Sequence, residues 1–178
     1  MNDSIRCEVI EGICIKICDN VSVDDIIASH YMKDAGSAQN LQALKEHFFE
    51  SVAPGVGKAL GPKSIIVGGR NFGCGSSREH AIRLLKALGV PMILAESFAR
   101  SFYRNCINLG MPVLEGSALN CLVGGETLRV DTRSGEIDYV GNTVLKFTPL
   151  PAFVKEFGDA GGLIPYILAH GDYPSLNK

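Results

Sequence analysis

Residues Ser64–Glu96 read SIIVGGRNFGCGSSREHAIRLLKALGVPMILAE, and in this stretch two apolar runs flank a glycine-rich loop and a helical pattern. The runs SIIVGG and VPMILAE are short and apolar, as is typical of strands buried on both faces. Between them, apolar residues recur on one helical face, namely Ala81, Leu84, Leu85 and Leu88. Gly89 then provides a helix stop. This order predicts a strand, a helix and a second, parallel strand.

The next residues repeat this arrangement. SFARSFYRNCINLG (Ser97–Gly110) predicts a helix with Ser97 as its N-cap and Gly110 as its stop. MPVLEG (Met111–Gly116) predicts a third strand. The whole pattern is β-α-β-α-β, which implies parallel strands, right-handed crossovers and helices that cover the sheet.

The segment before this unit predicts a hairpin and a helix. IRCEVIEGICIKI (Ile5–Ile17) contains two β runs that are interrupted by Glu11-Gly12, so we expect a turn there. VSVDD (Val21–Asp25) begins like a strand, and LQALKEHFFESV (Leu41–Val52) has apolar residues near helical spacing.

The segment after the unit predicts a β-meander. Glu126–Phe147 read ETLRVDTRSGEIDYVGNTVLKF, in which RSG and GN separate three β runs. One or two short helices follow in LPAFVKEFGDAGGLIPYILAHG. We therefore expect a mixed α/β fold in a single domain spanning residues 1–178, with a small parallel unit flanked by antiparallel strands. A pure Rossmann topology does not fit this pattern.

Composition excludes several classes of protein. The chain has 178 residues, 46% of them hydrophobic and 20% charged, with a net charge of −2. A balance of this kind gives no general attraction to nucleic acid or to anionic lipid. No apolar run approaches the roughly 18 residues of a transmembrane helix, and the first residues lack the pattern of a secretory signal. We expect a cytoplasmic protein that binds neither nucleic acid nor membrane.

The cysteines and histidines do not predict a metal site. Six cysteines are scattered through apolar surroundings, which favours reduced and mostly buried thiols. Cys14 and Cys18 are the one close pair, and on a strand they would point to the same face. The four histidines are too far apart in the sequence to suggest a metal site, namely His30, His47, His80 and His170. We expect no metal bound within this chain.

The glycine-rich loop has the features of an anion site. It joins the carboxyl end of a predicted strand to the N-terminus of a predicted helix, where open α/β sheets bind ligands and where free N–H groups favour anions. Gly73 and Gly75 let the backbone approach a ligand closely or adopt positive φ. Arg78 adds a forked cation that matches a carboxylate.

Known loop motifs are absent. A Walker A loop requires a lysine, and none lies between Gly68 and Ile82. The dinucleotide fingerprint requires a third glycine, which this loop lacks. GCGSS is not the GxSxG elbow of a serine hydrolase. Spacing alone favours a capping box, with Ser76 as N-cap and Glu79 returning the bond, over a catalytic serine. His80 and Cys74 are expected to support and pack the loop.

The loop also resembles a known family. NFGCGSSREHA, followed by SFARSFYRNCINLGMPVLEG, closely resembles the small subunits of 3-isopropylmalate dehydratases, which are homologous to the swivelling C-terminal domain of aconitases. DNVSVDDIIASHYM resembles the family segment DNIDTDxIIPxRYL, and AGGLIPYI resembles its ending. The resemblance covers nearly the whole chain and implies a swivel-type β/β/α domain.

The resemblance implies a hydro-lyase. Such enzymes move a hydroxyl between neighbouring carbons of a di- or tricarboxylic acid through an enoate. In this family a large subunit carries the [4Fe-4S] cluster, whose open iron is the Lewis acid, so we expect no cofactor on this chain, a large-subunit partner, and no activity of the chain alone. The leading substrate is 2-isopropylmalate, converted to 3-isopropylmalate in leucine biosynthesis, with homoaconitate and methyl-substituted malates as runners-up.

The resemblance assigns roles to individual residues. Ser76 would be the catalytic base and Asp24 would organise the acid–base network. Ser77 and Arg78, with the open backbone at Gly75, would bind the substrate carboxylate. Lys33 would pair with a distal carboxylate or remain a solvated charge.

Three departures from the family pattern affect substrate identity: SVD for DTD, Ala28 for proline, and SHYMK for GRYLR. The competing hypothesis from another class is a non-catalytic regulatory module, in which Ser76 caps a helix and Arg78 holds a small carboxylate or phosphate.

Overall fold

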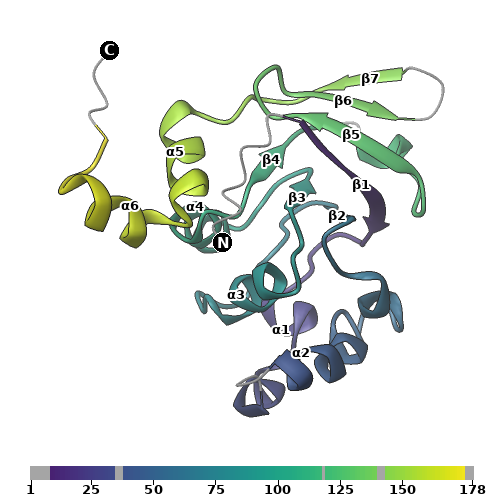
Figure 1. Ribbon diagram of the computed structural model, residues 1–178. Helices are drawn as coiled ribbons and strands as arrows, with labels where there is room; N and C mark the ends of the chain where they lie inside the picture. Colours follow the sequence, from purple (N-terminus) through teal and green to yellow (C-terminus); the bar gives the residue numbers. More distant parts are fainter. Residues whose placement is uncertain (1–8, 35–37, 118, 140–142, 175–178) are drawn as a thin grey trace.

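The computed structural model describes residues 9–34, 38–117, 119–139 and 143–174. Its centre is a seven-stranded mixed sheet with the strand order β4-β3-β2-β1-β5-β6-β7 (Figure 1). The strands are β1 (Val9–Lys16), β2 (Ser64–Gly68), β3 (Met92–Ala95), β4 (Val113–Glu115), β5 (Thr127–Asp131), β6 (Glu136–Tyr139) and β7 (Thr143–Lys146). β1 to β4 are parallel, and β5 to β7 are antiparallel to their neighbours.

The predicted β-α-β-α-β unit is confirmed. It consists of β2, α3 (His80–Ala87), β3, α4 (Arg100–Leu109) and β4, and its three strands are parallel. The predicted apolar face of α3 is buried. Gly89 and Gly110 end their helices with φ of +83° and +66°, the left-handed conformation that such stops require.

The predicted hairpin over Ile5–Ile17 is wrong for the part that the structure describes. Glu11 and Gly12 lie inside the continuous strand β1, which pairs with β2 on one side and with β5 on the other. A Cβ on Gly12 would lie 2.9 Å from Ile65 Cγ1 and 3.0 Å from the Lys63 carbonyl oxygen. The glycine therefore serves close packing against β2 rather than a turn. Ile5 to Glu8 lie outside the described residues.

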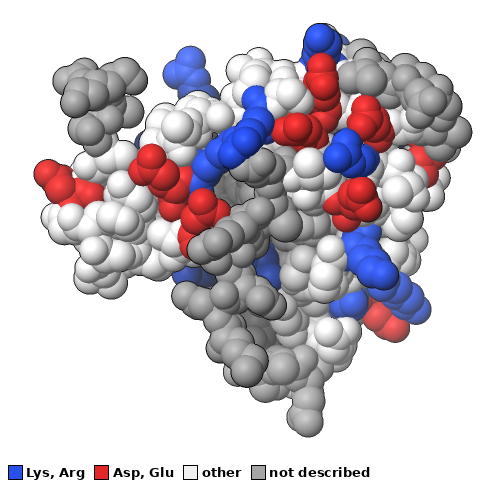
Figure 2. All heavy atoms as spheres, turned by 45° about the horizontal axis from the view of Figure 1, so that its top comes forward, with Lys and Arg blue, Asp and Glu red and all other residues white. Residues whose placement is uncertain are grey.

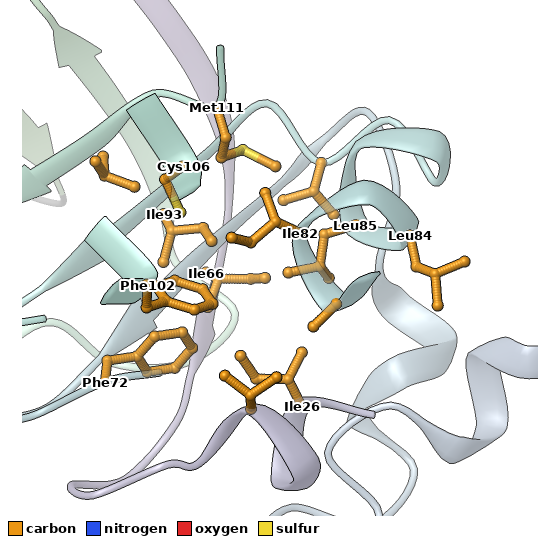
Figure 3. Packing of buried hydrophobic residues seen from close by; sticks show 14 of the residues in the cluster. Ile26, Ile66, Phe72, Ile82, Leu84, Leu85, Ile93, Phe102, Cys106 and Met111 are labelled. Atoms are coloured by element: carbon orange, nitrogen blue, oxygen red, sulfur yellow. The ribbon is translucent and has the colours of Figure 1, made fainter. Parts of the chain in front are cut away.

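Alternate residues of the sheet feed two apolar layers. Ile66 and Ile93 point from the sheet toward the helices. They belong to one apolar cluster with Phe72, Ile82 and Phe102 (Figure 3). Their strand neighbours belong to a second layer, which residues of the β5–β6–β7 meander complete. That layer includes Ile65, Val67, Met92, Leu94, Leu128, Val130 and Ile137. Because both faces of β2 and β3 are covered, these strands read as continuous apolar runs.

The predicted meander is confirmed in β5, β6 and β7. Its outer face is charged: Arg129 lies 3.5 Å from Glu11 and 3.2 Å from Asp138. Figure 2 shows acidic and basic side chains side by side on the face that carries the meander. The alternation of apolar and charged positions keeps one side of this antiparallel sheet in the core and the other in water.

Shorter elements surround the sheet. The described α-helices outside the parallel unit are α1 (Val23–Ile26), α2 (Ala38–Leu44), α5 (Ala152–Ala160) and α6 (Leu163–His170). The 3-10 turns are η1 (Ser29–Asp34), η2 (Lys45–His47), η3 (Val56–Ala59) and η4 (Leu119–Cys121). Figure 1 places α5 and α6 beside α4, at the end of the chain. The two predicted C-terminal helices are thus confirmed.

Two local predictions in the N-terminal half are wrong. Val23–Ile26 is helical rather than extended, because Ser22 and Asp25 form a capping box there. The helix expected over 41–52 stops earlier, since α2 ends at Leu44 and, after η2, Phe48 is extended with φ −70° and ψ 128°.

The cysteines follow the prediction in part. Cys14 and Cys106 are buried free thiols, and burial raises the pKa of Cys14 to about 11, so this thiol stays protonated at neutral pH. Cys18 and Cys121 are exposed. Cys14 and Cys18 do not share a strand face, because β1 ends at Lys16.

Candidate active site at the carboxyl ends of the parallel strands

Three loops meet where β1, β2 and β3 end. Backbone hydrogen bonds continue the strands into the loops: Gly69 N donates to Cys18 O at 3.2 Å, and Glu96 N donates to Gly69 O at 3.1 Å. Further out, isolated parallel bridges pair Ser22 with Cys74 and Phe72 with Phe98. The serine loop, which we define as residues 69–79, is therefore held between the loops that follow β1 and β3.

Glycines in the serine loop are required for two different reasons. Gly73 has φ +78°, and a Cβ there would lie 2.1 Å from the ring of Phe102 on α4. Gly75 has φ +83° but open space around it, with Ser22 Cβ as its nearest neighbour at 3.5 Å. Gly73 thus permits close packing of the loop on α4, whereas Gly75 permits the left-handed turn that precedes Ser76.

An ion pair and an amide pair join the loops after β1 and β2. Asp19 Oδ1 accepts from Arg70 N at 2.8 Å, and its Oδ2 accepts from Arg70 Nη2 at 2.9 Å. The backbone N–H of Arg70 and then its guanidinium lower the pKa of Asp19 below its usual range. Asn20 and Asn71 both have positive φ, and Asn71 Nδ2 donates to Asn20 Oδ1 at 3.1 Å.

Ser76 forms a tight turn with Arg78. The Ser76 side chain is half-buried, and its Oγ accepts a hydrogen bond from Arg78 N at 3.2 Å. This hydrogen bond spans two residues, so it closes a serine turn ahead of the helix rather than a helix cap. The carbonyl of Ser77 accepts from Asn105 Nδ2 at 2.8 Å, which ties the turn to α4.

The predicted capping box at Ser76 and Glu79 and the predicted N-cap at Ser97 are both wrong. α3 begins at His80, its N-cap is Glu79, and that cap has no side-chain hydrogen bond. The Glu79 carboxylate instead accepts from Arg83 Nη2 at 2.8 Å. Ser97 does not cap α4 either: Ala99 is the N-cap, and Ser97 Oγ accepts from Asn71 N at 2.9 Å.

Asp24 lies opposite the serine loop on α1. Its Oδ1 is 3.9 Å from Arg78 Nη1, and both side chains are more than half exposed. The carboxylate and the guanidinium therefore form a loose, solvent-exposed ion pair. The structure brings Asp24, Ser76, Ser77 and Arg78 together, with Gly75 in the same loop.

Lys33 lies in η1, the 3-10 turn that follows α1 in the chain. Its backbone belongs to this 3-10 turn, while its side chain lies outside the described residues. Tyr31 of the same turn is stacked on His47, with ring centroids 3.9 Å apart. The predicted role of Lys33 stays a prediction.

Sequence reasoning missed the partners that hold the loop. Asp19, Arg70, Asn71 and Asn105 all bond to loop backbone or to one another. Three of them lie inside the segments that carry the family resemblance, yet none was assigned a role. Their signal in the sequence was weak: a charged or amide residue next to a predicted strand end, or on the polar side of a predicted helix.

Comparison with known proteins identifies the fold family. The model of the aconitase C-terminal domain matches residues 12–118, more than half of the chain. The chain belongs to the aconitase C-terminal domain family.

Relatives in this family match over nearly their whole length. The chain is 38% identical to "3-isopropylmalate dehydratase small subunit 1" of Thermotoga maritima, covering 94% of this chain and 100% of the relative. It is 41% identical to "Isopropylmalate/citramalate isomerase small subunit" of Methanocaldococcus jannaschii, covering 89% and 94%. These coverages agree with the small-subunit resemblance.

Solved structures agree with this assignment. A crystal structure of 3-isopropylmalate dehydratase from Methanocaldococcus jannaschii superposes with a TM-score of 0.81 at 31% identity, covering 92% of this chain and 95% of that one. Aconitase X from Thermococcus kodakaraensis superposes with a TM-score of 0.55 at 21% identity. This second likeness concerns the fold alone.

The described part of this aconitase-family chain offers no preformed metal centre. Within residues 9–34, 38–117, 119–139 and 143–174, no group of three or more His, Cys, Asp or Glu side chains is arranged to hold a metal ion. Across the same residues, no helix is long and apolar enough to cross a membrane.

Proposed function

We propose that this chain is the small subunit of an aconitase-family hydro-lyase that isomerises a hydroxy di- or tricarboxylic acid by dehydration and rehydration. The observation that carries the proposal is the serine loop, which places Ser76, Ser77 and Arg78 beside Asp24 at the carboxyl ends of parallel strands. The leading substrate is 2-isopropylmalate, converted to 3-isopropylmalate, because relatives matched over nearly their full length are named for isopropylmalate.

We assign Ser76 as the base, and the support for this role is the hydrogen bond that its Oγ accepts from Arg78 N. In the dehydration, the Ser76 oxygen takes the proton from the carbon next to the one that bears the hydroxyl. The C–H electron pair forms the double bond, and the hydroxyl leaves as hydroxide, which a proton from solvent converts to water. Water then adds across the double bond with the positions of hydrogen and hydroxyl exchanged.

The loop favours the charged form of this base. A serine hydroxyl is a very weak acid, so its alkoxide needs strong local stabilisation. The Arg78 N–H donates to Ser76 Oγ, and the Arg78 guanidinium belongs to the same turn. Donors that are already in place when charge develops are the most effective form of such stabilisation.

Arg78 and Ser77 are assigned to the substrate carboxylate. A guanidinium can donate two parallel hydrogen bonds to a carboxylate. In the free chain the Arg78 side chain faces Asp24 at 3.9 Å, too long for a tight hydrogen-bonded pair. An incoming carboxylate can therefore engage Arg78 without first breaking a strong internal bond, while Asp24 remains close enough to orient it.

The leaving hydroxyl requires a Lewis acid from another chain. The described residues contain no arrangement of ligands for a metal, so we derive no step through one on this chain. We assign that chemistry to a [4Fe-4S] cluster on a large-subunit partner, which would withdraw the hydroxyl oxygen. A cytoplasmic location of the complex remains a prediction.

Reconstitution tests the function. The chain is combined anaerobically with an aconitase-family large subunit from the same organism, and enoate absorbance is followed with 2-isopropylmalate, citramalate and homoaconitate in turn. We expect turnover of 2-isopropylmalate with the highest kcat/KM, and no turnover by either chain alone. A complex that turns over none of the three acids would refute the hydro-lyase assignment.

Calorimetry separates this proposal from a non-catalytic module that binds a small acid. Such a module binds a carboxylate or phosphate tightly as an isolated chain, irrespective of any partner. The hydro-lyase subunit is expected to bind 2-isopropylmalate weakly alone and tightly in the complex. Tight binding by the isolated chain, unchanged by the partner, would favour the module.

A further inference from the structure

Asn105 is hydrogen-bonded to the Ser77–Arg78 peptide group, which also donates a hydrogen bond to Ser76. Its side-chain Nδ2 donates to the Ser77 carbonyl oxygen at 2.8 Å. The N–H on the other end of that same peptide group belongs to Arg78 and donates to Ser76 Oγ at 3.2 Å. One peptide unit therefore links an amide on α4 to the hydroxyl of the proposed base.

The geometry of a peptide group makes this link directional. In a trans peptide the C=O and N–H point in opposite directions and share a delocalised system. A donor on the carbonyl side withdraws electron density from the group, which makes its N–H a stronger donor. Hydrogen bonds in such a chain polarise one another, so the Asn105 amide strengthens the bond that reaches Ser76.

α4 supports the loop at a second point. Phe102, three residues before Asn105, lies against Gly73, where a Cβ would be 2.1 Å from its ring. Residues three apart lie on the same side of a helix. Phe102 is buried and holds the loop by packing, whereas Asn105 is half-exposed and holds it by a hydrogen bond. Removing Asn105 should therefore alter the turn without emptying the core.

We infer that Asn105 is a positioning residue for the reaction: by holding and polarising the Ser77–Arg78 peptide, it aims the Arg78 N–H at Ser76 Oγ and stabilises the alkoxide. The inference rests on the proposed function, because it assumes that Ser76 is the base. Asn105 touches no reacting atom in this account and acts entirely through that peptide.

The test uses the complex with the large subunit and two variants of Asn105. Asn105→Leu removes the donor at similar volume, and Asn105→Asp replaces the donor by a carboxylate that repels the Ser77 carbonyl. Asn108→Asp is the matched control, since it makes the same change one turn further along α4 and leaves the Asn105–Ser77 bond intact. Thermal unfolding is measured for all four chains.

We expect Asn105→Leu to lower kcat about tenfold at neutral pH with KM within about twofold of wild type, and Asn105→Asp to lower it further. The part of the pH–kcat profile in which kcat rises with pH should move to higher pH in both Asn105 variants. The reason is that a less stabilised alkoxide forms only at higher pH. A merely structural role would scale the rate equally at every pH. Asn108→Asp should keep the wild-type profile.

A readout independent of turnover tests the first link. The ¹⁵N–¹H resonance of the Arg78 amide is recorded in the isolated chain, and it should shift upfield in proton frequency in Asn105→Leu but not in Asn108→Asp. An unchanged Arg78 resonance, or a pH profile that keeps its shape in both Asn105 variants, overturns the inference. If wild type itself shows no turnover, the proposed function fails and the catalytic role of Asn105 fails with it, whatever the resonance does.

Discussion

Gly73 shows how a single residue fixes the site. Its φ of +78° is strained for any other residue, and an added Cβ would collide with the Phe102 ring at 2.1 Å. The loop can lie flat on α4 only while this position has no side chain. The backbone N–H of Gly73 also donates to Val21 O at 2.7 Å, so a shift here would disturb the loop after β1.

We therefore expect Gly73→Ala to destabilise the protein by about 2–4 kcal/mol, the sum of a positive-φ cost and an overpacking cost. Gly125→Ala is the control: φ there is +91°, but nothing lies within 4 Å of the added Cβ, so it should cost only about 1 kcal/mol. Urea unfolding measures both. Equal costs for the two variants would show that the contact with Phe102 does not matter.

Among the secondary elements, α1 depends most on one hydrogen-bond network. Ser22 Oγ accepts from Asp25 N at 3.0 Å, while the Asp25 carboxylate accepts from Ser22 N at 2.9 Å and from Ser51 Oγ at 2.7 Å. Burial acts to raise the pKa of Asp25, but the bonds from Ser22 and Ser51 outweigh it and lower the pKa. The capping box thus orients the short helix that carries Asp24.

A lowered folded pKa fixes the sign of the pH dependence. The folded chain binds the Asp25 proton less readily than the unfolded chain, so this stabilisation is present above 3.8, the unperturbed pKa of aspartate, and is lost as pH falls through the lowered pKa. Asp25→Asn should flatten the decline of the free energy of unfolding in that acidic window. Ser22→Ala removes the Ser22 Oγ hydroxyl, which donates to Asp25 Oδ2 at 2.6 Å, but keeps the carboxylate, so it should flatten the decline in part. A decline identical to wild type in both variants would contradict this account of α1.

Sequence patterns predicted the elements whose apolar spacing is unambiguous and failed where one residue serves a tertiary contact. The period of Ala81, Leu84 and Leu85 gave α3 its buried face correctly. Gly12 looked like a turn residue, yet it lies within β1. The Ile65 side chain of β2 packs where a Cβ on this residue would lie. No local pattern contains that information.

The serine loop shows the same limit. Ser76 and Glu79 have the spacing of a capping box, but Ser76 Oγ is engaged by Arg78 N and α3 begins only at His80. The true capping box lies at Ser22 and Asp25, where serine and aspartate have equivalent spacing. Gly75 and Arg78 were predicted from the glycine-rich loop itself and the roles of Ser76 and Asp24 from the family resemblance, while the hydrogen bonds around them required the fold.

The central sheet presents two different surfaces of the molecule, one at its parallel strand ends and one on its meander. The carboxyl ends of β1 to β3 carry the serine loop, and the meander β5–β7 presents a charged outer face next to water. If a large subunit supplies the other half of the active site, it must cover the first part. The meander need not be covered.

Hydrogen exchange tests this division. On binding the large subunit, amides of residues 69–79 and 17–22 should exchange at least about tenfold more slowly, since a stable interface excludes water from its centre. Amides of β6 and the outer positions of β5 should exchange as in the free chain. Protection confined to the meander would place the partner on the wrong face for the proposed chemistry.

If Ser76 is the base of a hydro-lyase, its hydroxyl must mediate the exchange of the substrate proton with solvent. The complex is incubated with 2-isopropylmalate in D₂O, and deuterium uptake at the carbon that loses its proton is followed by NMR or mass spectrometry. Wild type should exchange this position during turnover. Ser76→Ala should bind the substrate with similar affinity but exchange at least about 100-fold more slowly, as expected for loss of a general base. Exchange by Ser76→Ala at the wild-type rate would contradict the claim.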